Sequence, residues 1–356
     1  MGAVNHQKMN HIIREDIEQI VNSSLQWSLL EDKTVLISGG NGFLPAYMIE
    51  VMLFLNKNVF RKKTKIVTIV RDIQKTKNKF SHHNNIENDV TFLVQDVNDP
   101  ISIDGNIDYI IHAASQASPK FYNVDPIGTL SANVLGTLNL LTVAKKCATK
   151  IFLYFSSSEV YGIVEDAKQP IKESNYGYLD PLQIRSCYAE SKRMGENICI
   201  SWMHQYGLPI KIIRPFHIYG PGMSLDDGRV YADFVSDIVH GRNIIMKSEG
   251  LSKRSFCYLA DSTVAFFKVL FDGVNGEAYN VGNSKQEISI INLANKLISF
   301  FPERNIEVEK YKSKDKSYLQ STVQRINPDL QKINELGWFA KTSIDEGFLR
   351  TIKSYE

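Results

Sequence analysis

The stretch Lys33-Thr-Val-Leu-Ile-Ser-Gly-Gly-Asn-Gly-Phe-Leu-Pro-Ala46 decides the fold. Its apolar first half predicts a short buried strand, and its glycines predict a tight turn that opens a helix over residues 46–55. Pro45 takes the position of a third glycine, which the first turn of a helix tolerates. Glycines in this context let the backbone approach a pyrophosphate at the helix N-terminus. The stretch therefore predicts a dinucleotide-binding loop made of Gly39, Asn41, Gly42, Phe43 and Leu44.

The pattern around this loop predicts an α/β fold. Apolar runs at residues 65–70, 90–94, 109–112, 151–155 and 210–213 are separated by enough chain for crossover helices, which favours a doubly wound parallel sheet. We expect an N-terminal helical extension over residues 1–30 and a Rossmann-type dinucleotide-binding domain over 31–215. Segments near 255–285 are expected to return to that domain, and a smaller α/β substrate lobe is expected over 216–356.

Composition excludes several classes of protein. The 356 residues carry 41 Lys plus Arg against 39 Asp plus Glu, so the net charge of +2 gives no basic field for nucleic acid or for an anionic membrane. The four cysteines include no C-x-x-C pair, so neither a metal site nor a disulfide framework is expected. The N-terminus has no apolar core of a signal peptide, and no apolar run approaches about 18 residues. A cytoplasmic protein with a small-molecule partner is therefore predicted.

The end of the second strand selects between NAD and NADP. An acidic residue there hydrogen-bonds the ribose hydroxyls, whereas an arginine pairs with a 2′-phosphate. Arg71 favours NADP, and the adjacent Asp72 keeps NAD open. The alternative is that Arg71 is only a solvated residue at the rim. Asp96 and Val97, after the third strand, are expected to flank the adenine.

The spacing of Tyr188 and Lys192 indicates proton-transfer chemistry. Residues four apart lie on one face of a helix, so this phenol and ammonium are neighbours. Positive charge from Lys192 and from a nicotinamide is expected to lower the pKa of Tyr188, which prepares it to exchange a proton with a carbinol or carbonyl oxygen. A serine-rich segment, SSSEVYG at residues 156–162, follows the strand at 151–155 and is expected nearby.

Together these motifs carry a resemblance to a known family. The segments are GGNGF, IIHAASQASP, NVLGTLNLL, SSSEVYG, YAESK, IRPFHIYGPG and KRSFCYLAD. The chain resembles the extended short-chain dehydrogenases/reductases that act as nucleotide-sugar epimerases, dehydratases and decarboxylases, from about Lys33 to Trp338. Within that family, SSSEVYG, IRSCYAESKR, DDGRV and KRSF are most similar to segments of UDP-glucuronate decarboxylases.

The resemblance implies roles for particular residues. Ser157 would hydrogen-bond the sugar O4, Tyr188 would be the acid/base at that oxygen, and Lys192 would bind the nicotinamide ribose. Glu159, taken as catalytic, and Ser158 would lie beside C5 and C6. The cofactor site would also include Ala113 and Ala114. Contacts to a nucleotide-diphosphate sugar are expected from Ser115, Asn133, Ser158, Arg185, His217, Arg229 and Arg254.

Ser158 and His217 bear on which reaction of the family is expected. Ser158 stands where dehydratases with an Asp-Glu pair have aspartate, which argues against a dTDP-glucose-type 4,6-dehydratase, although a Ser-Glu pair also resembles GDP-mannose-type dehydratases. His217 stands where the family usually has asparagine, which weakens the transfer of any one substrate. The resemblance favours a UDP-glucuronate decarboxylase reaction. The alternatives are NADPH-dependent reduction of a 4-keto-6-deoxyhexose nucleotide such as a dTDP sugar, 4-epimerisation, 4,6-dehydration, and a non-catalytic dinucleotide sensor. The family also implies a homodimer formed by the helices through residues 135–144 and 188–202.

Overall fold

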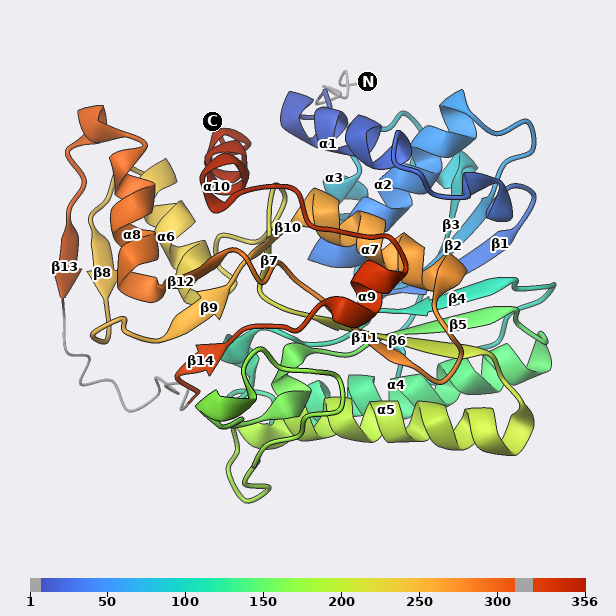
Figure 1. The fold of residues 1–356 in the computed structure, drawn as a ribbon. Helices are drawn as coiled ribbons and strands as arrows, with labels where there is room; N and C mark the ends of the chain where they lie inside the picture. Colours follow the sequence, from blue (N-terminus) through green and yellow to red (C-terminus); the bar gives the residue numbers. More distant parts are fainter. Residues whose placement is uncertain (1–7, 311–322) are drawn as a thin grey trace.

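One parallel sheet of seven strands organises the protein (Figure 1). The structure is a computed structural model that describes residues 8–310 and 323–356. In order across the sheet, the strands are β11 (Ala278–Val281), β6 (Ile210–Pro215), β5 (Ile151–Phe155), β4 (Tyr109–His112), β1 (Thr34–Ser38), β2 (Lys65–Val70) and β3 (Val90–Val94). The chain order reverses between β1 and β4, which is where ligands bind in open α/β sheets. The predicted Rossmann-type fold is confirmed.

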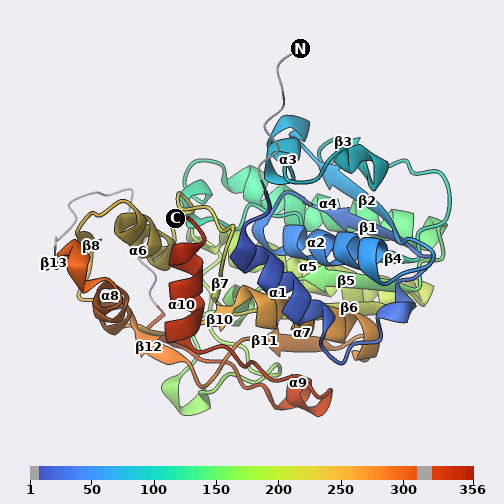
Figure 2. The ribbon, with the colours of Figure 1, turned by 90° about the horizontal axis from the view of Figure 1, so that it is seen from above.

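Helices cover both faces of this sheet, which is why its strands are nearly continuous apolar runs. On one face lie α1 (His11–Val21), α2 (Phe43–Asn58) and α7 (Leu259–Asp272), and on the other lie α4 (Pro126–Lys146) and α5 (Ser186–Tyr206) (Figures 1 and 2). Helix α2 begins three residues before the predicted start. Pro45 fits there because the first N–H groups of a helix have no partner within it.

The second half of the chain builds a smaller lobe beside the sheet (Figure 1). It holds α6 (Val230–Val239), α8 (Ile290–Ser299) and α10 (Ile344–Lys353) with the short strand pairs β8 (Ile244–Met246) with β13 (Val308–Lys310) and β7 (Ile218–Tyr219) with β10 (Cys257–Tyr258). A third small sheet joins β12 (Glu287–Ser289), β9 (Lys253–Ser255) and β14 (Arg325–Ile326). Between these elements the chain returns to the main sheet, because α7 covers its face and β11 pairs with β6. The short helix α9 (Gln331–Glu335) packs against β11.

Helix α4 is long and apolar enough to span a membrane, judged by length and composition alone. In the described structure, 44% of its most apolar window is buried, and α4 packs against α5 and β4. A buried core helix passes the same test, so this is weak support for a membrane span. No uninterrupted apolar run marks α4 in the sequence, because Thr129, Asn133 and Thr137 lie within it.

Candidate active site

The glycine turn lies against the chain that leaves β4. The Ser38 hydroxyl accepts the N–H groups of Ala113 and Ala114, each at 3.1 Å, and pairs with His112 Nδ1 at 2.8 Å. Gly39 follows with φ +74°, and a Cβ on it would lie 2.8 Å from Ala114 Cα. Only glycine fits there without displacing backbone. The structure therefore brings the predicted cofactor residues Gly39, Ala113 and Ala114 together.

The N-terminus of α2 is open toward this turn. Gly42 is its N-cap residue and supplies no side-chain hydrogen bond, so the first N–H groups of the helix are not capped by that residue. Asn41, Phe43 and Leu44 are partly exposed beside it. Pro45 contributes no N–H. The first N–H groups of α2 can therefore donate to an anion. Because Pro45 has no N–H, this loop has one donor fewer than a loop with a third glycine.

Of the two residues that follow β2, Arg71 rather than Asp72 is available to contact a ribose. Asp72 caps α3 (Ile73–Lys79), and its carboxylate accepts the N–H of Lys75 at 2.9 Å. The Arg71 side chain is 65% exposed, and its NH1 lies 3.8 Å from Asp96 Oδ2. Val97 is buried and lies against Gly136 of α4. Arg71 and Asp96 therefore lie at the same edge of the sheet, as predicted.

Tyr188, Ser157 and Lys192 meet at the carboxyl end of β5. Tyr188 is buried on α5, and its phenol is close enough to the Ser157 side chain for that serine to oppose the rise in the Tyr188 pKa. The Lys192 side chain is buried one turn further along α5, and its Nζ donates to Phe155 O at 2.7 Å and lies 5.8 Å from the Tyr188 ring centroid. Ser158 is buried and Glu159 half-buried in the turn that Ser157 caps. The four predicted catalytic residues therefore lie in one site.

The protein groups around Tyr188 raise its pKa. Burial raises the pKa of Tyr188, and Ser157 and Arg229 only partly oppose it. Burial also lowers the pKa of Lys192 to about 7, with Glu196 opposing. A lysine that loses part of its charge supports a phenolate less than an ordinary one. The predicted lowering of the Tyr188 pKa, which also depends on the positive charge of a nicotinamide, stays a prediction.

Tyr122 is a site residue that the sequence analysis missed. Its ring stacks on that of Tyr188, with centroids 5.5 Å apart and planes 15° from parallel. The aromatic partner fixes the tilt of the Tyr188 ring. Tyr122 follows a 3₁₀ turn after β4, where no periodicity marks it. A lone aromatic residue in an irregular segment gives no local signal of this contact.

Asn133 connects α4 to the catalytic helix and has one free acceptor. Its Nδ2 donates to Ser191 Oγ at 2.9 Å, and that hydroxyl donates to Tyr188 O at 2.9 Å. Its Oδ1 is buried without a partner. In the structure Asn133 therefore positions the backbone of α5, and its predicted contact with the substrate stays a prediction.

A buried ion pair fixes β5 against α5. Arg214 on β6 donates to both carboxylate oxygens of Glu196 on α5, at 2.8 and 2.6 Å. The Ser156 hydroxyl, at the end of β5, donates to Glu196 Oε1 at 2.5 Å. Because Ser157 follows Ser156 and Tyr188 is two turns before Glu196, this network sets the distance between the two catalytic side chains. The sequence analysis did not identify it, since its members are far apart in the chain.

Arg229 and His217 lie on the lobe side of the site. Arg229 NH2 donates to Ala117 O at 3.1 Å, and its NH1 lies 3.0 Å from Asp227. His217 has a left-handed φ of +34°, and its Nδ1 is buried without a partner. Burial, with Arg254 and Arg229 nearby, lowers the pKa of His217 to about 3. The imidazole is therefore neutral and adds no charge to the two arginines.

Arg254, Arg185 and Glu159 interact electrostatically at the same site. Burial lowers the pKa of Arg254, Glu159 opposes that shift, and Arg185 adds to it. The Arg254 guanidinium is oriented from β9 by hydrogen bonds to the carbonyls of Lys253 and Val323, at 2.8 and 2.7 Å. These arginines give the site a positive side facing Glu159.

The residues present fit a nicotinamide dinucleotide and a second, anionic ligand. Ser115 Oγ, after β4, and Asn98 Oδ1, after β3, are buried without partners along the carboxyl edge of the sheet. Buried polar atoms are normally paired, so such orphans indicate a ligand-facing edge. The same edge holds the Gly39 turn and the start of α2.

Comparison with known proteins identifies the family. The model of the NAD dependent epimerase/dehydratase family matches residues 35–282. The chain belongs to this family. UDP-glucuronic acid decarboxylase 5 of Arabidopsis thaliana is 33% identical over 314 residues, which cover 88% of this chain and 86% of that protein. The predicted resemblance to extended short-chain dehydrogenases/reductases is confirmed, and the chain is an enzyme of that type.

Solved structures agree on the fold. UDP-glucuronic acid 4-epimerase from Bacillus cereus, in complex with UDP-glucuronic acid and NAD, has a TM-score of 0.73 at 20% identity and covers 90% of this chain and 98% of its own. RMD from Pseudomonas aeruginosa, complexed with NADPH, has a TM-score of 0.68 at 24% identity and covers 91% and 99%. Relatives of this fold therefore bind either dinucleotide.

Replacing Gly39 with alanine tests the cofactor site. We expect Gly39→Ala to weaken binding of NAD and NADP by about tenfold or more, because its Cβ would collide with Ala114. Gly207→Ala is the matched control, since φ is +69° and nothing lies within 4 Å of its Cβ. Isothermal titration measures both affinities. Equal affinities in the two variants would place the dinucleotide away from this turn.

Proposed function

We infer that this enzyme decarboxylates a UDP-glucuronate-like nucleotide sugar. The assembly of Ser157, Tyr188 and Lys192 at the carboxyl end of β5 is the observation that carries the inference. The relative named as a UDP-glucuronic acid decarboxylase, alignable over most of both chains, supports this reaction over others on the same fold. The complete set of three side chains also argues against a non-catalytic sensor.

Tyr188 acts on the hydroxyl at C4. When bound, NAD or NADP would supply the hydride acceptor and donor for C4. Tyr188 takes the O4 proton and later gives it back, while Ser157 orients the phenolic oxygen of Tyr188 and the sugar O4 relative to each other. Burial raises the pKa of Tyr188 and so opposes its deprotonation. The positive charges of the nicotinamide and of protonated Lys192 act in the opposite direction and favour the phenolate. Lys192 is fixed for this role by Phe155 O.

The arginines face the acidic parts of the substrate. A ketone at C4 makes the carboxylate on C5 a β-keto acid, so the bond to that carboxylate breaks, carbon dioxide leaves, and C5 takes a proton. We assign the substrate carboxylate to the side of the site that holds Glu159, Arg185 and Arg254. The two guanidinium groups there outweigh the single negative charge of Glu159, so this side is positive and suits an anion. Arg229 and the neutral His217 are assigned to the diphosphate.

Reduction of a 4-keto-6-deoxyhexose nucleotide by NADPH is the second candidate. It is favoured by the exposed Arg71 and by Asp72, whose carboxylate is engaged as a helix cap. An arginine at this position suits a 2′-phosphate. The same Ser157, Tyr188 and Lys192 serve this reaction, with Tyr188 giving a proton to the ketone oxygen.

Tyr188→Phe tests the proposed chemistry. We expect turnover of UDP-glucuronate to UDP-pentose and carbon dioxide to fall by about 10²–10⁴-fold, because the proton at O4 loses its acceptor, while cofactor affinity stays within about twofold. Tyr178→Phe, at an exposed tyrosine of the described structure, is the control. Wild-type protein that consumes NADPH with a 4-keto-6-deoxyhexose nucleotide and leaves UDP-glucuronate unchanged would support the second candidate and refute the first.

Arg71→Gln tests the cofactor preference. We propose that NADP binds more tightly than NAD, and the variant should lose about 10–100-fold in NADP affinity, the worth of a charge-assisted phosphate contact. Its NAD affinity should hardly change. Titration with each dinucleotide measures both. Equal losses for the two would show that Arg71 does not contact the 2′-phosphate.

The homodimer and the cytoplasmic location stay predictions. The outer surface of α4 and α5 exposes Ile127, Leu135 and Met194, which suits a helix-to-helix interface between two copies. Light scattering that gives the mass of a single chain at micromolar concentration would refute the dimer.

A further inference from the structure

Glu50, His82 and His83 form a cluster outside the active site. Glu50 lies on α2, and the two histidines follow α3. His82 Nε2 lies 2.9 Å from Glu50 Oε1, and His83 Nε2 lies 2.7 Å from Glu50 Oε2. The imidazole centroids are 4.4 Å apart. Two imidazoles therefore converge on one carboxylate, each on a different oxygen.

The carboxylate of this cluster is ionised although it is buried. The side chain of Glu50 is only 7% exposed. Burial raises the pKa of Glu50, but the hydrogen bonds from His82 and His83 outweigh it and hold the pKa below its ordinary value. Lys79 also interacts with Glu50, yet its Nζ donates to Gly222 O at 3.3 Å. The buried negative charge is thus faced directly by imidazole nitrogens.

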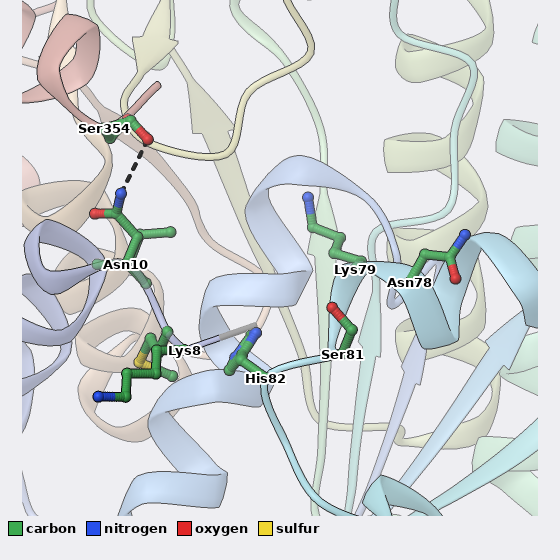
Figure 3. A pocket seen from close by; sticks show the side chains of 9 residues that line it. Lys8, Asn10, Asn78, Lys79, Ser81, His82 and Ser354 are labelled. Atoms are coloured by element: carbon green, nitrogen blue, oxygen red, sulfur yellow. Dashed lines mark hydrogen bonds between the residues drawn. The ribbon is translucent and has the colours of Figure 1, made fainter. Parts of the chain in front are cut away.

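A pocket borders His82, one member of the cluster (Figure 3). It has a volume of about 230 Å³ and is bounded by the start of α1, the end of α3 and the C-terminal Ser354. His82 lines it together with Lys79 and Ser81. The side chains of His82 and His83 are 14% and 27% exposed. Both imidazoles therefore keep some contact with solvent, and His82 borders the pocket.

We propose that Glu50, His82 and His83 bind a divalent transition-metal ion, for which zinc is the best match. Two imidazoles and one carboxylate are a common zinc donor set, with the fourth position left to water. Three donor atoms, one from each residue, lie within 4.8 Å of one another. Ligands of four-coordinate zinc at about 2.0–2.1 Å lie roughly 3.3 Å apart. The two histidine-to-carboxylate distances, 2.9 and 2.7 Å, would therefore lengthen by about 0.5 Å, and any wider separation between donor atoms, up to 4.8 Å, would shorten. The ion would replace the ring protons that face Glu50.

The ion would join the segment after α3 to the middle of α2. Glu50 lies on the helix that starts at the glycine turn, and α3 begins directly after Arg71 and Asp72. The role is structural, since the donors belong to neither the Tyr188 site nor its arginines. The cysteine pattern predicts no metal site, and no local spacing marks this cluster, since 32 residues separate Glu50 from His82.

Zinc titration of the untagged, full-length enzyme tests this site. After removal of metals with a chelator, equilibrium dialysis should give one tightly bound zinc per chain and a thermal midpoint several degrees higher. His83→Gln and Glu50→Gln should each lower zinc affinity by roughly 100-fold. His204→Gln, at an exposed histidine of α5, is the control and should bind zinc like the wild type.

Three results would overturn the proposal. Wild-type protein without stoichiometric zinc would show that the cluster is a hydrogen-bonded link only. Zinc bound equally by the wild type and by His83→Gln would place the ion elsewhere. If the variants fail to fold, the visible spectrum of the cobalt-loaded wild type decides. Cobalt at the proposed site should show the intense absorption of a four-coordinate ion with nitrogen and oxygen ligands. A weak, six-coordinate spectrum would contradict the proposal. Each readout is independent of sugar turnover, so the proposed function is tested separately.

Discussion

The hydroxyl of Ser38 fixes the end of β1 to the chain that leaves β4. Because all seven strands run parallel, their carboxyl ends form one edge, and the order reverses between these two strands. The Ser38 contacts bring Ala114 so close that Gly39 has no room for a side chain. The backbone at Gly39 therefore carries no side chain where a dinucleotide is predicted to approach, and this packing produces the predicted cofactor site.

A second constraint sets the catalytic distances. Glu196 and Arg214 are buried together, and breaking such a pair leaves an uncompensated charge in the interior. Ser156 shares the Glu196 carboxylate, so the end of β5 cannot shift along α5 without loss of that bond. Ser157 and Tyr188 are thereby kept in contact. The same carboxylate opposes the burial that lowers the pKa of Lys192, so one buried acid supports both the geometry and the charge of the site.

Local patterns were enough to predict the sheet, the glycine turn and the pairing of Tyr188 with Lys192. Strands buried on both faces, and side chains four residues apart on a helix, depend only on residues that are close together in the sequence. The remainder depends on residues distant in the chain. The stack of Tyr122 on Tyr188, the burial that raises the pKa of Tyr188, and the convergence of His82 and His83 on Glu50 arise only once the chain has folded.

In the proposed reaction, Tyr188 and its partners permit transient oxidation at C4 before the carboxylate on C5 is lost. Turnover of UDP-glucuronate in deuterium oxide, followed by nuclear magnetic resonance of the product, tests this order of events. The expected product is a pentose that carries solvent deuterium at C5 and keeps the substrate hydrogen at C4, since that hydrogen leaves and returns as hydride. Solvent deuterium at C4, or a pentose without deuterium at C5, would rule out this mechanism.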